Sequence, residues 1–227
     1  MRLYLVPVWF YSYSILFEVF FAFTTLLVAW YALKLYKVSE EKHLRRFGIG
    51  FLLISISYSL LAFMNISILT EIKEGVRELS LNMSNVWLWS TISVYAHALF
   101  YVSGIVAVAY ATLKIDSRRT FLLIWAISVG AIFFCSQNYA IVYIISAILI
   151  LFIVWNYFDE STKKNRGSVK AITFAFVLLF LANIEFALAE NNYIHYVVKH
   201  VLELAAYIII LLSLIKVINH GEKTKQA

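Results

Sequence analysis

The sequence contains long intervals without a charged residue, and one of them sets the fold class. Between Arg119 and Asp159 lie 39 residues with no Asp, Glu, Lys or Arg. A helix crosses a lipid bilayer with about 20 mostly apolar residues, so this interval suits two short membrane spans. Only 14% of the chain is charged and 63% is hydrophobic, whereas about a quarter of a soluble domain is charged. The chain is therefore expected to be an all-α integral membrane protein.

Seven apolar segments are long enough to form transmembrane helices, and together they predict a single membrane domain over residues 1–227. The first segment runs to about Tyr36, which is too long for a cleavable signal peptide, so it is expected to be the first span. The polar residues Cys135 to Asn138 interrupt the uncharged interval and predict a tight turn. The predicted helices of this seven-helix bundle cover residues 7–36, 47–69, 88–113, 120–136, 139–158, 169–189 and 195–217, and residues 70–87 are expected to form an outer interfacial segment.

The basic residues are concentrated at alternate junctions between the predicted helices. Fifteen of the 19 lysines and arginines lie at the junctions that follow the first, third, fifth and seventh helices, and the other side holds only Arg2, Lys73, Arg77 and Lys199. Cytoplasmic loops are enriched in Lys and Arg, so we expect a multi-pass protein of the cell membrane with its N-terminus outside and its C-terminus in the cytoplasm. This distribution explains the net charge of +6 without nucleic acid as a partner. A glycosylation acceptor pattern, Asn82-Met83-Ser84, lies on the expected outer side.

The ionisable residues inside the predicted helices lie at similar depths, in the outer half of the bilayer. An ionisable side chain in hydrocarbon costs about 2.5 to 3.5 kcal/mol on insertion scales, so each needs a partner or a function. Three helices carry such residues at helical spacing, which places them on one face of each helix. The three faces are Tyr11, Ser14, Glu18 and Thr25; Ser93, His97, Tyr101 and Gly104; and Tyr196, His200, Glu203 and Tyr207.

These faces are expected to converge inside the bundle and to line a polar pocket that opens to the outside, because facing lipid would leave them unsatisfied. The candidate ligand-binding residues are Glu18, His97, Tyr101, Glu185, His200, Glu203 and Tyr207. A packing role is the alternative, in which Glu203 pairs with His200 or Lys199 and joins the last helix to its neighbours. Glu18 is expected to be protonated or paired with a cation, and Glu190 and His195 to be solvated loop residues.

The same residues suggest that the pocket could hold a metal ion. His97, His200, Glu203 and Glu18 offer the nitrogen and oxygen ligands that suit Zn or Fe, and sites in helical bundles recruit ligands from facing helices. A metal-dependent intramembrane hydrolase, of the seven-helix ceramidase-like kind, is the corresponding enzyme. The chain departs from that family, because His195 and His200 do not have its HxxxH spacing. Retinal is excluded as a cofactor by the sequence pattern, since no lysine for a Schiff base lies between Val201 and Ile215.

The layout of the chain resembles the seven-helix input regions attached to microbial signalling proteins. The stretches RRFGIGFLLISISYSLLAF and HVLELAAYIIILLSLI are similar to helices 2 and 7 of such regions. The resemblance implies a sensor-like or receptor-like protein that binds a small ligand and passes the signal to a cytoplasmic partner. A proton- or ion-coupled transporter is a further alternative, although carriers usually have internal repeats and broken helices, and this chain has one proline and seven glycines. Whether the protein is an enzyme stays open at this point.

Overall fold

The computed structural model describes residues 8–78, 83–114, 117–134, 140–164, 167–189 and 193–226, and these residues form seven α-helices. The helices are α1 (Val8–Ser39), α2 (Lys42–Glu78), α3 (Met83–Leu113), α4 (Arg118–Phe134), α5 (Ala140–Lys164), α6 (Gly167–Leu188) and α7 (Tyr193–Gln226). The turn predicted at Cys135 to Asn138, the acceptor Asn82 and the expected loop residue Glu190 lie outside the described residues. The side chain of Tyr11 is not described either.

Six of the seven helices are long and apolar enough to cross a membrane, which indicates a membrane protein. The membrane-crossing parts are Ser12–Ser39, Lys42–Ser67, Thr91–Leu113, Ala140–Thr162, Val169–Leu188 and Ile194–Val217. The seventh helix, α4, is shorter, with 17 residues. Most of the helices extend beyond the predicted spans, and residues 70–78 continue α2 rather than form a separate segment. Hydropathy marks only the apolar part of a helix, whereas the backbone hydrogen bonds continue into the polar residues at its ends.

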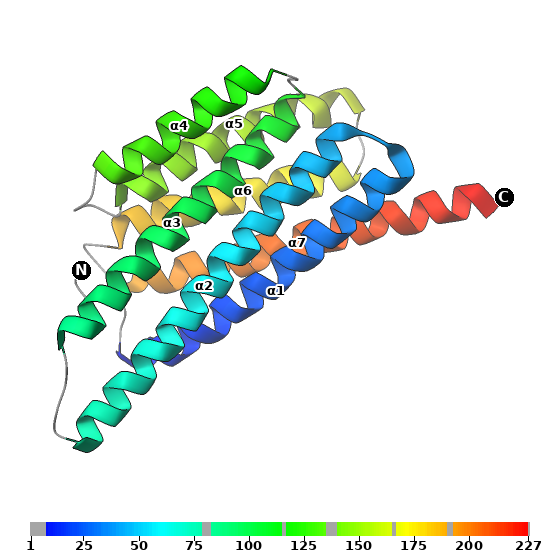
Figure 1. The fold of residues 1–227 in the computed structure, drawn as a ribbon. Helices are drawn as coiled ribbons and strands as arrows, with labels where there is room; N and C mark the ends of the chain where they lie inside the picture. Colours follow the sequence, from blue (N-terminus) through cyan, green and yellow to red (C-terminus); the bar gives the residue numbers. More distant parts are fainter. Residues whose placement is uncertain are drawn as a thin grey trace.

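Consecutive helices run in opposite directions, so α1, α3, α5 and α7 begin at one end of the bundle (Figure 1). We call this end of the bundle the N-terminal end. The opposite end, where the same four helices stop, is called the C-terminal end. Six helices form a closed ring in the order α1, α2, α3, α5, α6 and α7, because each packs against the next and α7 returns to α1. The remaining helix, α4, lies outside this ring and packs mainly against α3 (Figure 1).

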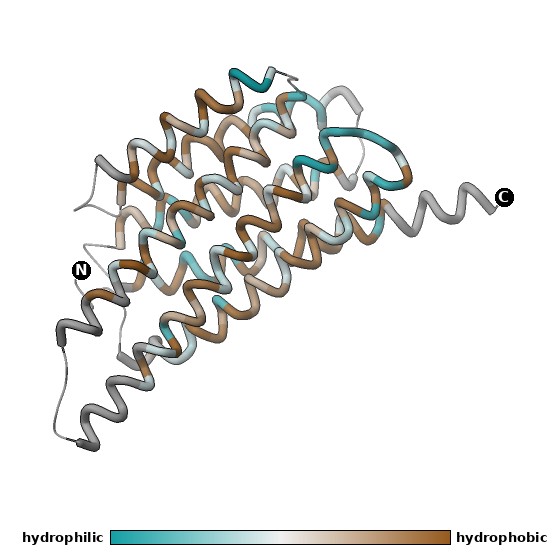
Figure 2. The backbone as a smooth tube through the Cα atoms, viewed as in Figure 1, coloured by the Kyte–Doolittle hydropathy of each residue, from teal (hydrophilic) through white to brown (hydrophobic). Residues whose placement is uncertain are grey.

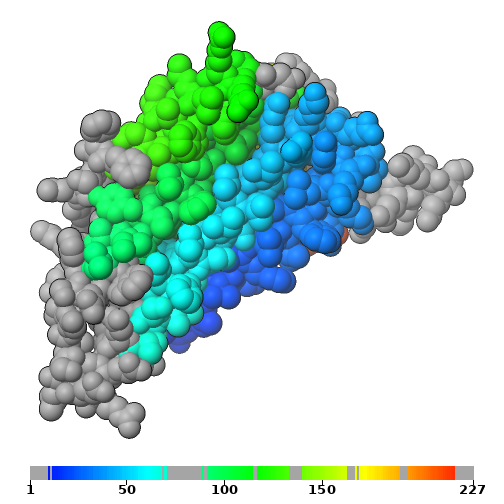
Figure 3. Space-filling view, in the orientation of Figure 1, coloured from blue at the N-terminus to red at the C-terminus, as the bar shows by residue number. Residues whose placement is uncertain are grey.

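Apolar side chains cover the outside of the bundle as well as its core. Leu16, Trp30, Phe63 and Trp155 are each more than half exposed, which is a surface suited to lipid rather than water. Figure 2 shows hydrophobic residues along the length of the helices and hydrophilic residues gathered where α1 meets α2. In the view of Figure 3 the side chains of α1, α2, α3 and α4 lie next to one another over one face. The exterior therefore indicates a lipid bilayer environment.

Two glycines bring α2 and α3 into close contact. A Cβ atom on Gly50 would lie 2.8 Å from the carbonyl oxygen of Gly104, and a Cβ atom on Gly104 would lie 2.7 Å from the carbonyl oxygen of Gly50. Small residues at such a position allow two helix backbones to approach closely. Gly104, predicted to belong to a polar face, thus serves helix packing. The close approach also brings Tyr58 of α2 beside His97 and Tyr101 of α3, with ring centres 5.4 and 6.0 Å apart.

Candidate functional site

A buried ion pair on α7 lies at the centre of the polar residues in the core. The Lys199 ammonium nitrogen Nζ lies 3.0 Å from Glu203 Oε2, and the two side chains are 4% and 0% exposed. Lys199 and Glu203 are four residues apart in one helix, a spacing that places their side chains next to each other. Tyr58, from α2 across the ring, donates a hydrogen bond of 3.0 Å to the second carboxylate oxygen, Glu203 Oε1. Each carboxylate oxygen of Glu203 therefore has its own polar partner.

Three further side chains extend this arrangement toward α3 and α6. The hydroxyl of Tyr207 lies 3.3 Å from the hydroxyl of Tyr58. Asn183 of α6 donates to the hydroxyl of Tyr101 at 3.3 Å and to the carbonyl of Leu179 at 2.7 Å. We call Lys199, Glu203, Tyr58, Tyr207, Tyr101 and Asn183 the core cluster. Its members come from α2, α3, α6 and α7, so helices from opposite sides of the ring meet at this point.

Aromatic rings surround the ammonium group of Lys199. Its Nζ lies 5.7 Å from the ring centre of Tyr143 and 5.2 Å from that of Phe186. A cation within about 6 Å of an aromatic face is attracted by the negative electrostatic potential of that face. The ammonium is thus stabilised by one carboxylate and two rings in a site away from water.

His97 lies beside the core cluster but has its own partners. Its ring nitrogen Nδ1 is 2.7 Å from the hydroxyl of Ser57, and that hydroxyl also donates a hydrogen bond of 2.9 Å to the His97 carbonyl. The hydroxyl of Tyr143 is 3.5 Å from Nε2 on the other side of the ring. One turn earlier on α3, the Ser93 hydroxyl is buried and has no hydrogen-bond partner among the described residues.

Glu18, Glu185 and His200 contact different residues and do not join the core cluster. Asn65 of α2 donates to both carboxylate oxygens of Glu18, at 2.9 and 3.0 Å. Glu185 Oε2 lies 2.5 Å from His195 Nδ1 near the N-terminal end, so His195 is a half-buried partner of α6 and not the solvated loop residue that was expected. The imidazole of His200 has a hydrogen-bonding contact of 2.8 Å between Nδ1 and the Tyr196 carbonyl.

The surroundings of His200 are otherwise aromatic. The ring centres of Phe10, Phe17 and Phe21, all from α1, lie 5.6, 5.8 and 6.0 Å from the centre of its imidazole. His200 therefore packs against aromatic rings of α1 and joins α7 to that helix. It does not approach Glu203 as a hydrogen-bonding partner, and the pairing of Glu203 observed here is the one with Lys199.

The four predicted metal ligands are distributed over separate contacts. Glu18 binds Asn65, His97 contacts Ser57, His200 contacts the Tyr196 carbonyl, and Glu203 pairs with Lys199. Within the described ranges, no group of three or more His, Cys, Asp or Glu side chains is placed to hold a metal ion. Metal binding by these residues stays a prediction from the sequence.

Apolar side chains close the core on the C-terminal side of the cluster. A narrow cavity of about 10 Å³ lies directly beyond Tyr101 and Tyr207, which is about the space of one water molecule. Its other lining residues are all apolar: Phe51, Ile54, Ile105, Val108, Ile150, Ile153, Phe176 and Leu179. The described carboxylates, histidines and lysine of the core thus gather toward the N-terminal end. Buried polar residues farther along, such as Ser161, Thr173 and Ser213, are hydroxyls bonded to carbonyls of their own helix.

Lys199 and Tyr58 were not among the site residues predicted from the sequence. Lys199 was counted with the basic residues of the outer side and was named only as a possible packing partner of Glu203, yet it is buried in the core and forms that pair. Its spacing of four residues from Glu203 was the available signal. Lys199 also lies two residues before the stretch Val201–Ile215, so the absence of a lysine from that stretch does not exclude a Schiff base in α7. Tyr58 has no such signal, because its partner Glu203 is 145 residues away in the chain.

Comparison with known proteins does not identify a relative. No protein-family model matches the chain, and neither a curated protein nor a solved structure matches it.

Proposed function

We propose that the protein is a sensor-like receptor of the cell membrane that binds a small carboxylate-bearing molecule at Lys199. The bound carboxylate replaces Glu203 as the partner of the Lys199 ammonium. The buried Lys199–Glu203 ion pair carries this proposal. It places an ammonium group in the core beside a carboxylate, which is the group that the proposed ligand also bears.

The proposed receptor crosses the membrane seven times, with its N-terminus outside and its C-terminus in the cytoplasm. The distribution of lysines and arginines supports this orientation. The position of α4 supports the seventh crossing, since α3 stops at the C-terminal end and α5 starts at the N-terminal end. At 1.5 Å per residue, the 17 residues of α4 extend about 26 Å, close to the thickness of the hydrocarbon core.

Exchange of the carboxylate is favoured by the low polarity of the site. Removing two ions from water costs several kcal/mol for each ion, and their attraction repays this cost only in good geometry. Lys199 Nζ lies 3.0 Å from Glu203 Oε2, and the other carboxylate oxygen, Oε1, accepts the hydrogen bond from Tyr58. In this proposal Glu203 takes up a proton as a ligand carboxylate displaces it, because a buried carboxylate left with only the hydrogen bond from Tyr58 would be destabilised. The buried hydroxyl of Ser93, one turn before His97 on α3, offers a further polar contact.

The one-sided arrangement supports a receptor over a transporter. The core cluster lies toward the N-terminal end, and the cavity beyond it is lined by apolar residues from α2, α3, α5 and α6. A transporter needs a polar route to both sides of the membrane. A receptor needs a connection between its site and the cytoplasm, and α7 supplies one, since it carries Lys199 and Glu203 and continues to Gln226 at the C-terminal end. A cytoplasmic partner that contacts the C-terminal end receives the signal in this proposal.

Binding of simple carboxylates to two α7 variants tests the proposal. Acetate, propionate and benzoate are added to the purified protein, and the corresponding amides serve as neutral controls. Glu203→Gln removes the internal competitor, so carboxylates should raise the unfolding temperature of this variant more than that of the wild type. The double variant Lys199→Met/Glu203→Gln lacks the cation and should not respond. Glu185→Gln removes a carboxylate that pairs with His195 outside the core cluster, and it should respond as the wild type does.

The proposal fails if no carboxylate stabilises Glu203→Gln more than the matching amide does. It also fails if the double variant responds as strongly as Glu203→Gln, because the carboxylate then binds at a place other than Lys199.

A further inference from the structure

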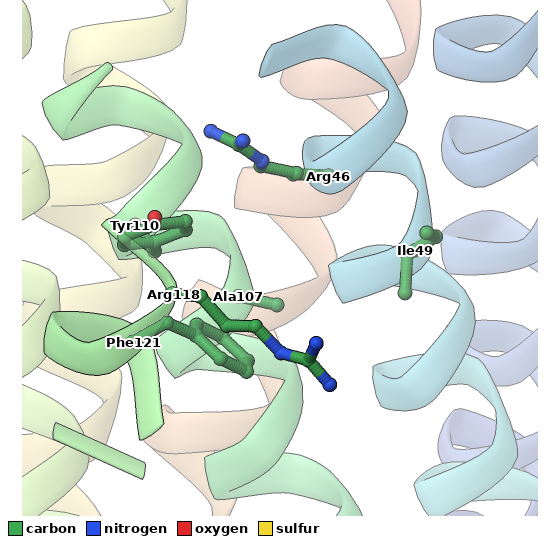
Figure 4. A pocket seen from close by; sticks show the side chains of 6 residues that line it. All are labelled: Arg46, Ile49, Ala107, Tyr110, Arg118 and Phe121. Carbon is green, nitrogen blue, oxygen red and sulfur yellow. The ribbon is translucent and has the colours of Figure 1, made fainter. Parts of the chain in front are cut away.

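A groove opens between α2 and α4 at the C-terminal end of the bundle, far from the core cluster. It contains a cavity of about 360 Å³ and is open to the surface. Both helices pack against α3, which forms the floor of the groove, but over the described residues they make no extensive contact with each other. The groove is lined by Arg46 and Ile49 of α2, Ala107 and Tyr110 of α3, and Arg118 and Phe121 of α4 (Figure 4).

Two arginines reach into the groove from opposite walls. Figure 4 shows the side chain of Arg46 extending from α2 and that of Arg118 extending from α4. The guanidinium carbon of Arg46 lies 5.0 Å from the ring centre of Tyr110, and the Tyr110 ring packs against Phe121 with centres 5.2 Å apart. These contacts hold Arg46 over the groove. Guanidinium groups suit phosphate, since their planar set of N–H donors matches phosphate oxygens.

The rest of the lining is apolar and continues into the lipid-facing surface. Ile49 is 40% exposed and Leu122, next to Phe121 on α4, is 49% exposed. Arg46 is the fifth residue of the second membrane-crossing segment, Lys42–Ser67, so the arginines lie where the apolar part of the bundle meets water.

We propose that this groove binds one anionic phospholipid from the leaflet at the C-terminal end. The anionic headgroup of the lipid contacts Arg46 and Arg118, whose guanidinium groups point apart in Figure 4, and one acyl chain follows Ile49, Ala107 and Phe121. A free phosphate ion uses only the arginines, whereas a phospholipid also fills the apolar floor that joins them to the surrounding lipid. Basic sites between helices at a membrane surface have the chemistry that recognises anionic headgroups. This site is independent of the carboxylate site proposed at Lys199.

A matched pair of double variants tests the site. Arg46→Gln/Arg118→Gln removes the two arginines of the groove. Arg45→Gln/Arg119→Gln removes the same charge from adjacent residues that are exposed and do not line the groove. The full chain in detergent is titrated with phosphatidylglycerol, with phosphatidylcholine of the same acyl chains, or with inorganic phosphate. Native mass spectrometry measures the fraction of protein that keeps one lipid.

The wild type should retain phosphatidylglycerol in preference to phosphatidylcholine. The groove variant should bind phosphatidylglycerol about tenfold more weakly, since each basic residue near the membrane surface contributes to attraction of anionic lipid, while the control variant stays within about twofold. Ala107→Phe fills the groove and keeps both arginines, so it should also lower retention. Only variants whose unfolding temperature is close to that of the wild type are compared.

Three results would overturn the proposal. Equal losses in the groove and control variants assign binding to general surface charge. Loss of the lipid on addition of millimolar inorganic phosphate assigns the site to a free anion. Unchanged retention in both Ala107→Phe and the groove variant shows that lipid does not occupy the groove.

Discussion

Lys199 and Glu203 illustrate, at the scale of single residues, how a low-polarity core magnifies the effect of one charge. Removing one partner of a buried ion pair leaves the other without compensation, which destabilises a protein by about 3 to 5 kcal/mol. Lys199→Met should therefore lower the unfolding temperature strongly, because Glu203 keeps only its hydrogen bond from Tyr58. The double variant Lys199→Met/Glu203→Gln should recover much of this loss, since neither charge remains.

Thermal unfolding of the wild type, both single variants and the double variant measures the coupling between the two residues. If the effects of the two single substitutions simply add, Lys199 and Glu203 do not interact as the distance of 3.0 Å implies.

The sequence predicted part of the core cluster at the residue scale. Glu203, Tyr207 and Tyr101 were identified from helical spacing, and all three lie in the core cluster. Glu18 and His200 were identified by the same rule and are buried, but they contact Asn65 and the Tyr196 carbonyl instead. Helical spacing tells which residues share a face, and depth along the helix tells which residues are level. Neither tells which neighbouring helix a face will meet, so partners on other helices could not be predicted, whereas Lys199 on the same helix was named as a possible partner of Glu203.

At the scale of helices, the contact between α2 and α3 depends on two residues without side chains. Gly104→Leu should push the helices apart and cost about 1 to 3 kcal/mol, because a Cβ atom there would lie 2.6 Å from Ile54 Cγ1 and 2.7 Å from the Gly50 carbonyl oxygen. Gly130→Leu in α4 is the control, since a Cβ atom at that position meets nothing within 4 Å. Unfolding in detergent, followed by circular dichroism, compares the two variants.

Equal stability of Gly104→Leu and Gly130→Leu would contradict the close approach of α2 and α3. The glycine contact could not be predicted from the sequence, which placed Gly104 on a polar face with Ser93, His97 and Tyr101. The spacing of Gly104 from His97 and Tyr101 is the same whether the glycine belongs to a polar face or to a helix contact. Only the position of α2 shows that it belongs to the contact.

At the scale of the whole molecule, the number of helices and their approximate positions in the chain follow largely from the apolar pattern. Each of the seven predicted spans overlaps one observed helix, from 7–36 with α1 to 195–217 with α7. Apolar runs could predict the helices because the bilayer requires every backbone group of a span to be hydrogen-bonded within the span. The place of α4 outside the ring of six helices had no signal in hydropathy, since a helix between lipid and protein is as apolar as one inside the bundle.

The number of crossings decides on which side of the membrane each helix end lies, and exposed positions can report it. Ser117 precedes α4, Thr162 lies near the end of α5, and Ile194 lies in the first turn of α7; all three are exposed. We expect cysteines at Ser117 and Thr162 to face the cytoplasm and a cysteine at Ile194 to face outward, because α4 and α5 together return the chain to the same side. The substitutions are made in a Cys135→Ser background, and a membrane-impermeant maleimide is added to intact or permeabilised cells. Labelling of Ser117→Cys and Thr162→Cys from opposite sides would mean that α4 does not cross the membrane. Labelling of both in intact cells, with Ile194→Cys labelled only after permeabilisation, would reverse the proposed orientation.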